Sequence, residues 1–165
     1  MKSLLYILIL LIINLIICDD ENMNFIMENI YLGDYVAASD EEYLKKFNIT
    51  SVVNCAKEIT SDYKDLKFLE LKLMDDPEEA IIPKFEVAYR FIKKNLKNKN
   101  TNILIHCAAG ASRSAALVAF YMMKEKKWDY DSCLSYMVAR RPVVDPNTGY
   151  ANQLRDYYYR YIIYS

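Results

Sequence analysis

The sequence predicts an α/β fold with a mainly parallel central sheet of about four to five strands, flanked by helices. Short β-branched runs alternate along the chain with longer segments of helical periodicity. Residues 103–105 are apolar at every position, as in a strand covered on both faces, and residues 115–123 are apolar on nearly every side, as in a central buried helix. The 165 residues are 53% hydrophobic and 26% charged, which is sufficient for a sizeable core.

The elements follow from these patterns in chain order. Strands are expected near 25–32, 51–55, 67–73 and 102–106, and helices near 40–47, 83–97, 113–125, 129–140 and 147–163. Asp129 is placed to cap the fourth helix, and Pro142 ends it. Because the chain has only 3 Gly and 4 Pro, we expect a single domain over 24–165 without linkers.

Aromatic residues recur near the C-terminus at helical spacing. The positions concerned are Tyr150, Leu154, Tyr157 or Tyr158, and Tyr161. This pattern favours an aromatic packing face over a recognition surface. Trp128 is interpreted in the same way, as a packing residue at the start of a helix.

Composition excludes several classes of function. With 21 Lys and Arg against 22 Asp and Glu, the net charge is -1. The chain therefore lacks the excess of positive charge that is typical of nucleic-acid-binding proteins. His106 is the only histidine, which rules out a cluster of histidines that would bind a metal. We expect no metal and no cofactor.

The segment Cys107–Arg113 joins the last predicted strand to the central helix, and we call it the phosphate loop. At a helix N-terminus the backbone N–H groups and the helix dipole stabilise a phosphoryl group or a thiolate, so Cys107 is a candidate nucleophile. Gly110 allows the loop to turn tightly. The planar guanidinium group of Arg113 can donate hydrogen bonds to two phosphoryl oxygens. Ser114 places a hydroxyl where it can donate to the sulfur when the sulfur leaves.

The other loop positions contribute backbone N–H groups to the bound phosphate. They are Ala108, Ala109, Gly110, Ala111 and Ser112. None of them is a lysine that could bind a second phosphate, so the loop favours phosphoproteins over inositol lipids.

The string H-C-x-x-G-x-x-R-S at residues 106–114 resembles the signature of the dual-specificity branch of the cysteine-based protein phosphatases. The resemblance covers roughly residues 25–160. Its further segments are Ile30–Gly33 with Ala37-Ala38, Ser51–Asn54, Arg141-Pro142, Pro146–Tyr150 and Gln153-Leu154. It implies the phosphatase fold and hydrolysis of phosphotyrosine and phosphoserine or phosphothreonine through a phosphocysteine.

Such a phosphatase needs a general acid to protonate the leaving oxygen. The strand near 67–73 is followed by Asp75-Asp76-Pro77, a turn that can lie over the phosphate loop. In the family the acid precedes a helix that ends in a Phe-Ile pair, and counting back from Phe91-Ile92 places it at Asp75. Asp76 is better explained as a cap of the turn.

Two further residues are expected to support the loop, His106 and Asn147. His106 can donate to loop carbonyls and help to hold the surroundings of the thiolate. The alternative is a buried histidine at a strand end that makes one hydrogen bond. For Asn147 the expectation comes from the resemblance of the segment around it.

Cys55 ends a strand that should lie beside the strand ending at Cys107, with both ends at the same sheet edge. An oxidised Cys107 could then be trapped by Cys55 as a reversible disulfide. The alternative, which we favour, is that Cys55 is a small buried hydrophobe, as Cys133 is on its helix.

Three classes of function compete for this loop. An active protein phosphatase agrees best with an intact nucleophile, arginine, serine and candidate acid. A phosphate-binding pseudophosphatase or a phosphatase of non-protein phosphoesters is the alternative. A sulfur-transfer or arsenate-reducing enzyme also uses a cysteine in an anion-binding loop, but the acid-bearing loop and the Arg-Ser ending argue against it.

Lys2 followed by the apolar stretch 4–17 has the form of a signal sequence, and it is short for a membrane span. Secretory entry is the expectation, with an uncleaved membrane anchor or an unused upstream start, and hence a cytoplasmic enzyme, as alternatives. Any membrane contact would be made through residues 4–17 alone. We expect a monomer that acts on phosphoprotein substrates and binds no nucleic acid.

Overall fold

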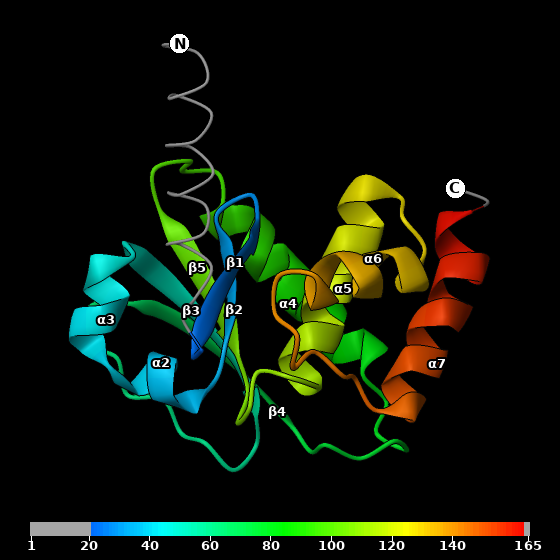
Figure 1. Cartoon of the computed structure of the whole chain (residues 1–165), viewed down its shortest axis with the longest axis horizontal. Coiled ribbons are helices and arrows are strands. Elements are labelled where there is room, and N and C mark those ends of the chain that lie inside the picture. Colours follow the sequence, from blue (N-terminus) through cyan, green and yellow to red (C-terminus); the bar gives the residue numbers. More distant parts are fainter. Residues whose placement is uncertain (1–20, 164–165) are drawn as a thin grey trace, which may run out of the picture.

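The computed structural model describes residues 21–163, which form a five-stranded sheet with helices on both faces (Figure 1). The strands are β1 Met23–Met27, β2 Ile30–Gly33, β3 Ile49–Ala56, β4 Lys67–Leu73 and β5 Asn102–His106. The helices are α2 Tyr35–Ser39, α3 Glu41–Lys46, α4 Ile82–Asn95, α5 Arg113–Lys126, α6 Tyr130–Val138, α7 Thr148–Tyr157 and the π-helical turn η1 Tyr158–Ile162. The predicted fold class is confirmed.

The strand order is β1-β2-β5-β3-β4, and every pairing except that of β1 with β2 is parallel. β5 is therefore the central strand, with β2 on one side and β3 on the other. The carboxyl ends of β2, β5, β3 and β4 meet at one sheet edge, which is where ligands bind in open α/β sheets. In Figure 1 the loops after β5 and β4 lie at this edge.

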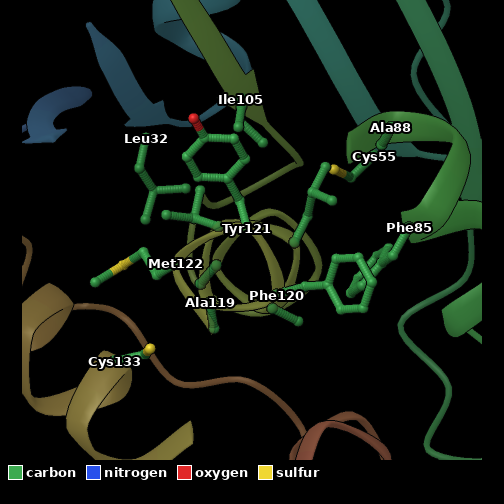
Figure 2. Packing of buried hydrophobic residues seen from close by; sticks show 14 of the residues in the cluster. Leu32, Cys55, Phe85, Ala88, Ile105, Ala119, Phe120, Tyr121, Met122 and Cys133 are labelled. Atoms are coloured by element: carbon green, nitrogen blue, oxygen red, sulfur yellow. The ribbon is translucent and has the colours of Figure 1, made fainter. Parts of the chain in front are cut away.

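Both faces of the sheet are covered, which explains the uninterrupted apolar run in β5. Ile103 and Ile105 belong to the large core beneath α4, α5, α6 and α7, whereas Leu104 belongs to a smaller core beneath α2 and α3. Figure 2 shows side chains of α5 pointing in several directions into this large core, with Phe120 near Phe85 of α4; their ring centroids are 5.6 Å apart. α5 is the buried central helix that the sequence predicts.

Side-chain caps begin four of the helices, because short polar side chains satisfy the N–H groups that a helix start leaves unpaired. The caps are Asp34 on α2, Asp40 on α3, Asp129 on α6 and Asn147 on α7. The prediction that Asp129 caps a helix is confirmed by a hydrogen bond of 2.7 Å from the Ser132 backbone N–H.

The single strand expected near 25–32 is wrong, because this stretch is a hairpin of two antiparallel strands. Glu28 and Asn29 form the two-residue turn between Met27 and Ile30, and both have positive φ, at 44° and 67°. Such a turn matches the twist of the flanking strands. The sequence analysis also missed α2, a helix of five residues that is too short to show a periodicity.

The C-terminal aromatic face is only partly buried. Tyr150 and Leu154 are fully buried, and Tyr157 contacts Phe120 with ring centroids 4.9 Å apart. Tyr161 is 61% exposed, so the prediction that it packs inward is wrong. The change from α-helix to the π-helical η1 at Tyr158 alters the number of residues per turn, and Ile162 rather than Tyr161 is buried in the core.

Trp128 lies at the start of α6 and packs against the ring of Tyr136, as predicted, with 39% of the residue exposed. The signal-like segment 1–20 lies outside the described residues. Within residues 21–163, no helix combines the length and the apolar character needed to cross a membrane.

Candidate active site

The phosphate loop runs from the end of β5 to the first turn of α5, and its carbonyl groups are all bonded to atoms outside the loop. The Ala108 oxygen accepts from the Tyr35 backbone N–H at 3.0 Å, and the Ala111 oxygen accepts from that of Asp145 at 2.9 Å. The C=O and N–H of a trans peptide point in opposite directions. With the carbonyls turned outward, the loop's N–H groups face inward, as a phosphate cradle requires.

Arg141 holds the middle of the loop from behind. It is 2% exposed, and its Nε and Nη2 atoms donate to the carbonyls of Gly110 and Ala109 at 3.0 and 3.1 Å. Gly110 has φ +65°, and a Cβ there would lie 2.4 Å from the Gly33 oxygen. Only glycine tolerates both this backbone conformation and this close approach.

Cys107 lies at the base of the loop and is 2% exposed. The Ser114 hydroxyl donates to the Cys107 sulfur at 3.1 Å. This is the contact expected from the sequence, because Ser114 occupies the first turn of α5 directly behind the sulfur. A hydroxyl in this position stabilises negative charge on the sulfur.

The Arg113 guanidinium is buried and is bonded to a carboxylate that the sequence analysis did not identify. Its Nη1 and Nη2 atoms each donate to one oxygen of Glu58 at 2.7 Å, and Nη1 also donates to the Leu73 carbonyl at 3.1 Å. Burial lowers the pKa of Arg113, but the hydrogen bonds to Glu58 and the charges of Cys107 and Asp75 outweigh burial and raise it. The same pair lowers the pKa of Glu58.

Asp75 faces the phosphate loop from the β4–α4 connection. Its Oδ1 atom accepts from the Ser112 hydroxyl and from the Asn147 amide, both at 2.7 Å, and its Oδ2 atom lies 3.9 Å from Arg113 Nε. Asn147 also caps α7 by accepting from the Tyr150 N–H at 2.9 Å. The structure thus brings Asp75 and Asn147 to the loop.

Asp76 points elsewhere, since its Oδ1 atom accepts from the Glu78 N–H at 2.9 Å and so ties the turn. The turn rests on α7. Gln153 accepts from the Ile81 N–H at 3.1 Å and donates to the Glu79 carbonyl at 2.8 Å. A Cβ on Gly149 would lie 1.9 Å from the Pro77 oxygen, so only glycine permits this approach.

His106 is completely buried on the sheet face opposite α5, the face of the smaller core. Its Nδ1 atom lies 3.3 Å from the Cys107 carbonyl, and burial lowers its pKa to about 4, so the ring is neutral at neutral pH. This arrangement agrees with the support expected from the sequence and equally with a buried histidine that makes one hydrogen bond.

Cys55 is fully buried in the large core, near Ala88 of α4 (Figure 2). β3 and β5 are neighbours with Asn54 opposite His106, and Cys55 and Cys107 follow these residues in the same core. Burial, followed by the charge of Cys107, raises the pKa of the Cys55 thiol well above its ordinary value. The thiols of Cys55, Cys107 and Cys133 are free.

The roles of two residues escaped the sequence analysis. Glu58 follows β3 by two residues at the ligand-binding sheet edge, and this position is the only signal that could have indicated it. Arg141 enters the sequence analysis only as part of the resemblance, and no local signal indicates its role, because its partners Gly110 and Asn24 lie far from it in sequence.

Comparisons with known proteins agree with this geometry. The profile of the family described as dual specificity phosphatase, catalytic domain, matches residues 30–160. The chain is 31% identical over 144 residues to protein phosphatase Slingshot homolog 3 of Mus musculus, covering 87% of this chain and 22% of that protein. It is 33% identical to tyrosine-protein phosphatase vhp-1 of Caenorhabditis elegans, covering 83% of this chain and 21% of that protein.

Solved structures give the same result. DUSP15 superposes with a TM-score of 0.82 at 27% identity, covering 88% of this chain and 92% of that one. The human tyrosine phosphatase-like serine/threonine/tyrosine-interacting protein has a TM-score of 0.79 at 31% identity, covering 86% and 99%. The chain spans about a fifth of the length of Slingshot homolog 3 and of vhp-1. The match over residues 30–160 shows that this chain belongs to the family of dual specificity phosphatase catalytic domains.

Proposed function

We propose that the chain hydrolyses phosphotyrosine and phosphoserine or phosphothreonine in proteins through a phosphocysteine at Cys107. The observation that carries this proposal is the contact of 3.1 Å between the Ser114 hydroxyl and the Cys107 sulfur, at the base of a loop whose N–H groups face inward. A thiolate in this place lies beneath the phosphorus of a phosphoryl group bound by the loop and by Arg113.

In the first step the Cys107 sulfur attacks phosphorus and the bond from phosphorus to the substrate oxygen breaks. Asp75 gives its proton to the leaving oxygen, which departs as a neutral hydroxyl. Arg113 and the loop N–H groups stabilise the charge on the three remaining phosphoryl oxygens.

In the second step the Asp75 carboxylate removes a proton from water as the water oxygen attacks phosphorus. The sulfur–phosphorus bond breaks and inorganic phosphate is released. The Ser114 hydroxyl stabilises the departing Cys107 thiolate, and Asp75 is protonated again for the next cycle.

The test is hydrolysis of an aryl phosphate by the full chain with a chelator present. Wild type should turn over, and Cys107→Ser should lose essentially all turnover while it still binds phosphopeptide through Arg113 and the loop. Cys133→Ser is the matched control, since it makes the same change at a buried cysteine outside the loop. Retained turnover in Cys107→Ser would overturn the mechanism.

A phosphate-binding pseudophosphatase is the second candidate, since one structural neighbour is described as phosphatase-like and as an interacting protein. The presence of Cys107 with its Ser114 contact favours turnover. A non-protein phosphoester remains the alternative substrate; the absence of lysine from residues 107–113 argues against an inositol lipid with several phosphates.

For the segment 1–20 we propose entry into the secretory pathway, with membrane contact confined to residues 4–17, and we propose a monomer. Support comes from Lys2 before the apolar stretch and from Asp19, Asp20 and Glu21 after it. An uncleaved anchor and an unused upstream start are the alternatives. An intact chain that begins at Met1 in a soluble cytosolic fraction would refute secretory entry.

A further inference from the structure

A polar cavity of about 160 Å³ lies next to the phosphate loop, on the sheet face covered by α2 and α3. Its walls come from α2 with the start of α3 and from the β3–β4 connection at 59–63, and His106 completes the lining. Tyr35 lines the cavity and its backbone N–H also bonds to Ala108 of the phosphate loop. The cavity therefore lies beside the phosphate loop, at the same end of the sheet as Cys107.

Two carboxylates line this cavity, those of Glu41 and Asp62. In the part of the chain that the structure describes, neither forms an ion pair within 4.0 Å. Lys45, on the same helix as Glu41, is paired with Glu42 at 3.1 Å. Two negative side chains that share one cavity favour a cationic guest.

The rest of the lining is suited to a cation. Tyr35, which is 50% exposed, and the half-buried Tyr63 provide aromatic rings, which attract ammonium and guanidinium groups. His106 is neutral and so does not repel positive charge. His106 Nε2 is buried and has no hydrogen-bond partner among the described residues, so the residue that completes the lining keeps an unused acceptor.

The walls are held in place. The Tyr63 hydroxyl donates to the Ala38 carbonyl at 2.9 Å, which joins the β3–β4 connection to α2. Asn54 donates to the Ile59 carbonyl at 2.7 Å and to the Ser61 hydroxyl at 3.1 Å. A cavity with tethered walls loses little entropy on binding, which favours affinity.

We propose that this cavity binds the lysine or arginine side chain of a substrate residue close in sequence to the phosphorylated residue. The inference rests on the proposed phosphatase function, and it names the class of substrate that the site prefers. An extended peptide advances about 3.3 Å per residue, so a basic residue up to three positions from the phosphorylated one reaches about 10 Å from it. A second phosphorylated or acidic residue there would be repelled by Glu41 and Asp62.

The test uses the full chain and a set of alanine-rich phosphotyrosine peptides in which one arginine is moved from position -3 to +3. The reference peptides carry alanine or glutamate instead. At one or two positions arginine should raise kcat/KM over alanine by about twofold to fivefold, as expected for exposed charge pairs. This ratio should shrink at high salt, because salt screens exposed charges.

The ratio of kcat/KM for the arginine peptide to kcat/KM for the alanine peptide should fall towards one in the double variant Glu41→Gln, Asp62→Asn. Glu42→Gln, Asp65→Asn is the matched control, which removes the same charges from the same helix and connection outside the cavity and should keep the ratio. Peptide binding to Cys107→Ser gives the same comparison without turnover.

No preference for arginine at any position would overturn the proposal, and so would a ratio that survives in Glu41→Gln, Asp62→Asn. An equal loss in the control variant would overturn it as well, by showing a general effect of charge. If wild type fails to hydrolyse aryl phosphate, the phosphatase proposal fails, and binding to Cys107→Ser still decides whether the cavity selects a basic side chain.

Discussion

The Arg113 guanidinium and the Glu58 carboxylate form a two-pronged ion pair, with Nη1 to Oε2 and Nη2 to Oε1 both at 2.7 Å. The two residues come from different elements, Arg113 from the start of α5 and Glu58 from the connection after β3. A guanidinium group whose two terminal nitrogens are both hydrogen-bonded to one carboxylate keeps a single orientation. Glu58 therefore acts as a positioning residue for Arg113.

Replacing Glu58 with alanine should lower kcat/KM for aryl phosphate on the order of tenfold to a hundredfold, because Arg113 loses the anchor that orients it. Glu58→Gln should retain more activity, since its amide oxygen still accepts one hydrogen bond. Steady-state kinetics of the two variants check this. A higher kcat/KM in Glu58→Ala would show instead that Glu58 competes with the substrate for Arg113.

Asp75→Asn should slow phosphotyrosine peptide hydrolysis by about a hundredfold or more, and hydrolysis of an activated aryl phosphate much less, because only a poor leaving group needs the proton. Asp76→Asn is the neighbouring control and should change both rates little, since Asp76 only ties the turn. The measurement is kcat for both substrates. A larger loss in Asp76→Asn would reverse the assignment.

Gly149→Ala tests the contact between α7 and the acid-bearing turn. Alanine favours a helix over glycine, yet its Cβ would lie 1.9 Å from the Pro77 oxygen and push the turn away. We expect a loss of about 1–3 kcal/mol in the free energy of unfolding and slower hydrolysis of poor leaving groups. Thr148→Ala, at the exposed neighbouring position, is the control. Unchanged stability and kinetics in Gly149→Ala would show that the acid-bearing turn moves away from α7 without a measurable cost, contrary to this prediction.

His106 should make the protein less stable in mild acid. Its pKa is lowered by burial from 6.5 to about 4. Between these values the unfolded chain binds a proton that the folded chain does not, so stability falls as the pH drops. The loss from pH 7 to pH 5 should be about 2 kcal/mol. Denaturant unfolding at both pH values measures it, and His106→Asn should abolish this difference. An unchanged difference would contradict the assignment.

Mild peroxide treatment followed by reductant decides between the redox role of Cys55 and the packing role that the sequence favours. In the redox role, peroxide oxidises the Cys107 thiolate to a sulfenic acid, and the Cys55 thiol then forms a disulfide with it and releases water. Wild type should then recover activity, and Cys55→Ser should recover much less. Cys133→Ser is the control and should recover as wild type does. Equal recovery in all three would leave Cys55 as a packing residue.

The sequence alone was sufficient for the elements whose signal is local. The phosphate loop lies within nine consecutive residues between a wholly apolar strand and a wholly apolar helix, so its geometry depends on short-range chain connectivity. Asp75 was proposed as the acid because it lies in the turn after one strand and because the family resemblance places the acid by its spacing from Phe91-Ile92. Asp129 could be identified as a cap because capping involves only the next three residues.

Only the tertiary structure decided the contacts that join distant segments. Arg113 and Glu58 are 55 residues apart, and Arg141 lies 31 residues from Gly110. The first pair meets because β5 lies beside β3, and the second because α6, which precedes Arg141, packs against α5. No local pattern encodes either arrangement. The cavity lined by Glu41, Asp62 and His106 arises in the same way. Apolar periodicity determines which residues are buried, whereas strand order determines which polar side chains meet at the edge of the sheet.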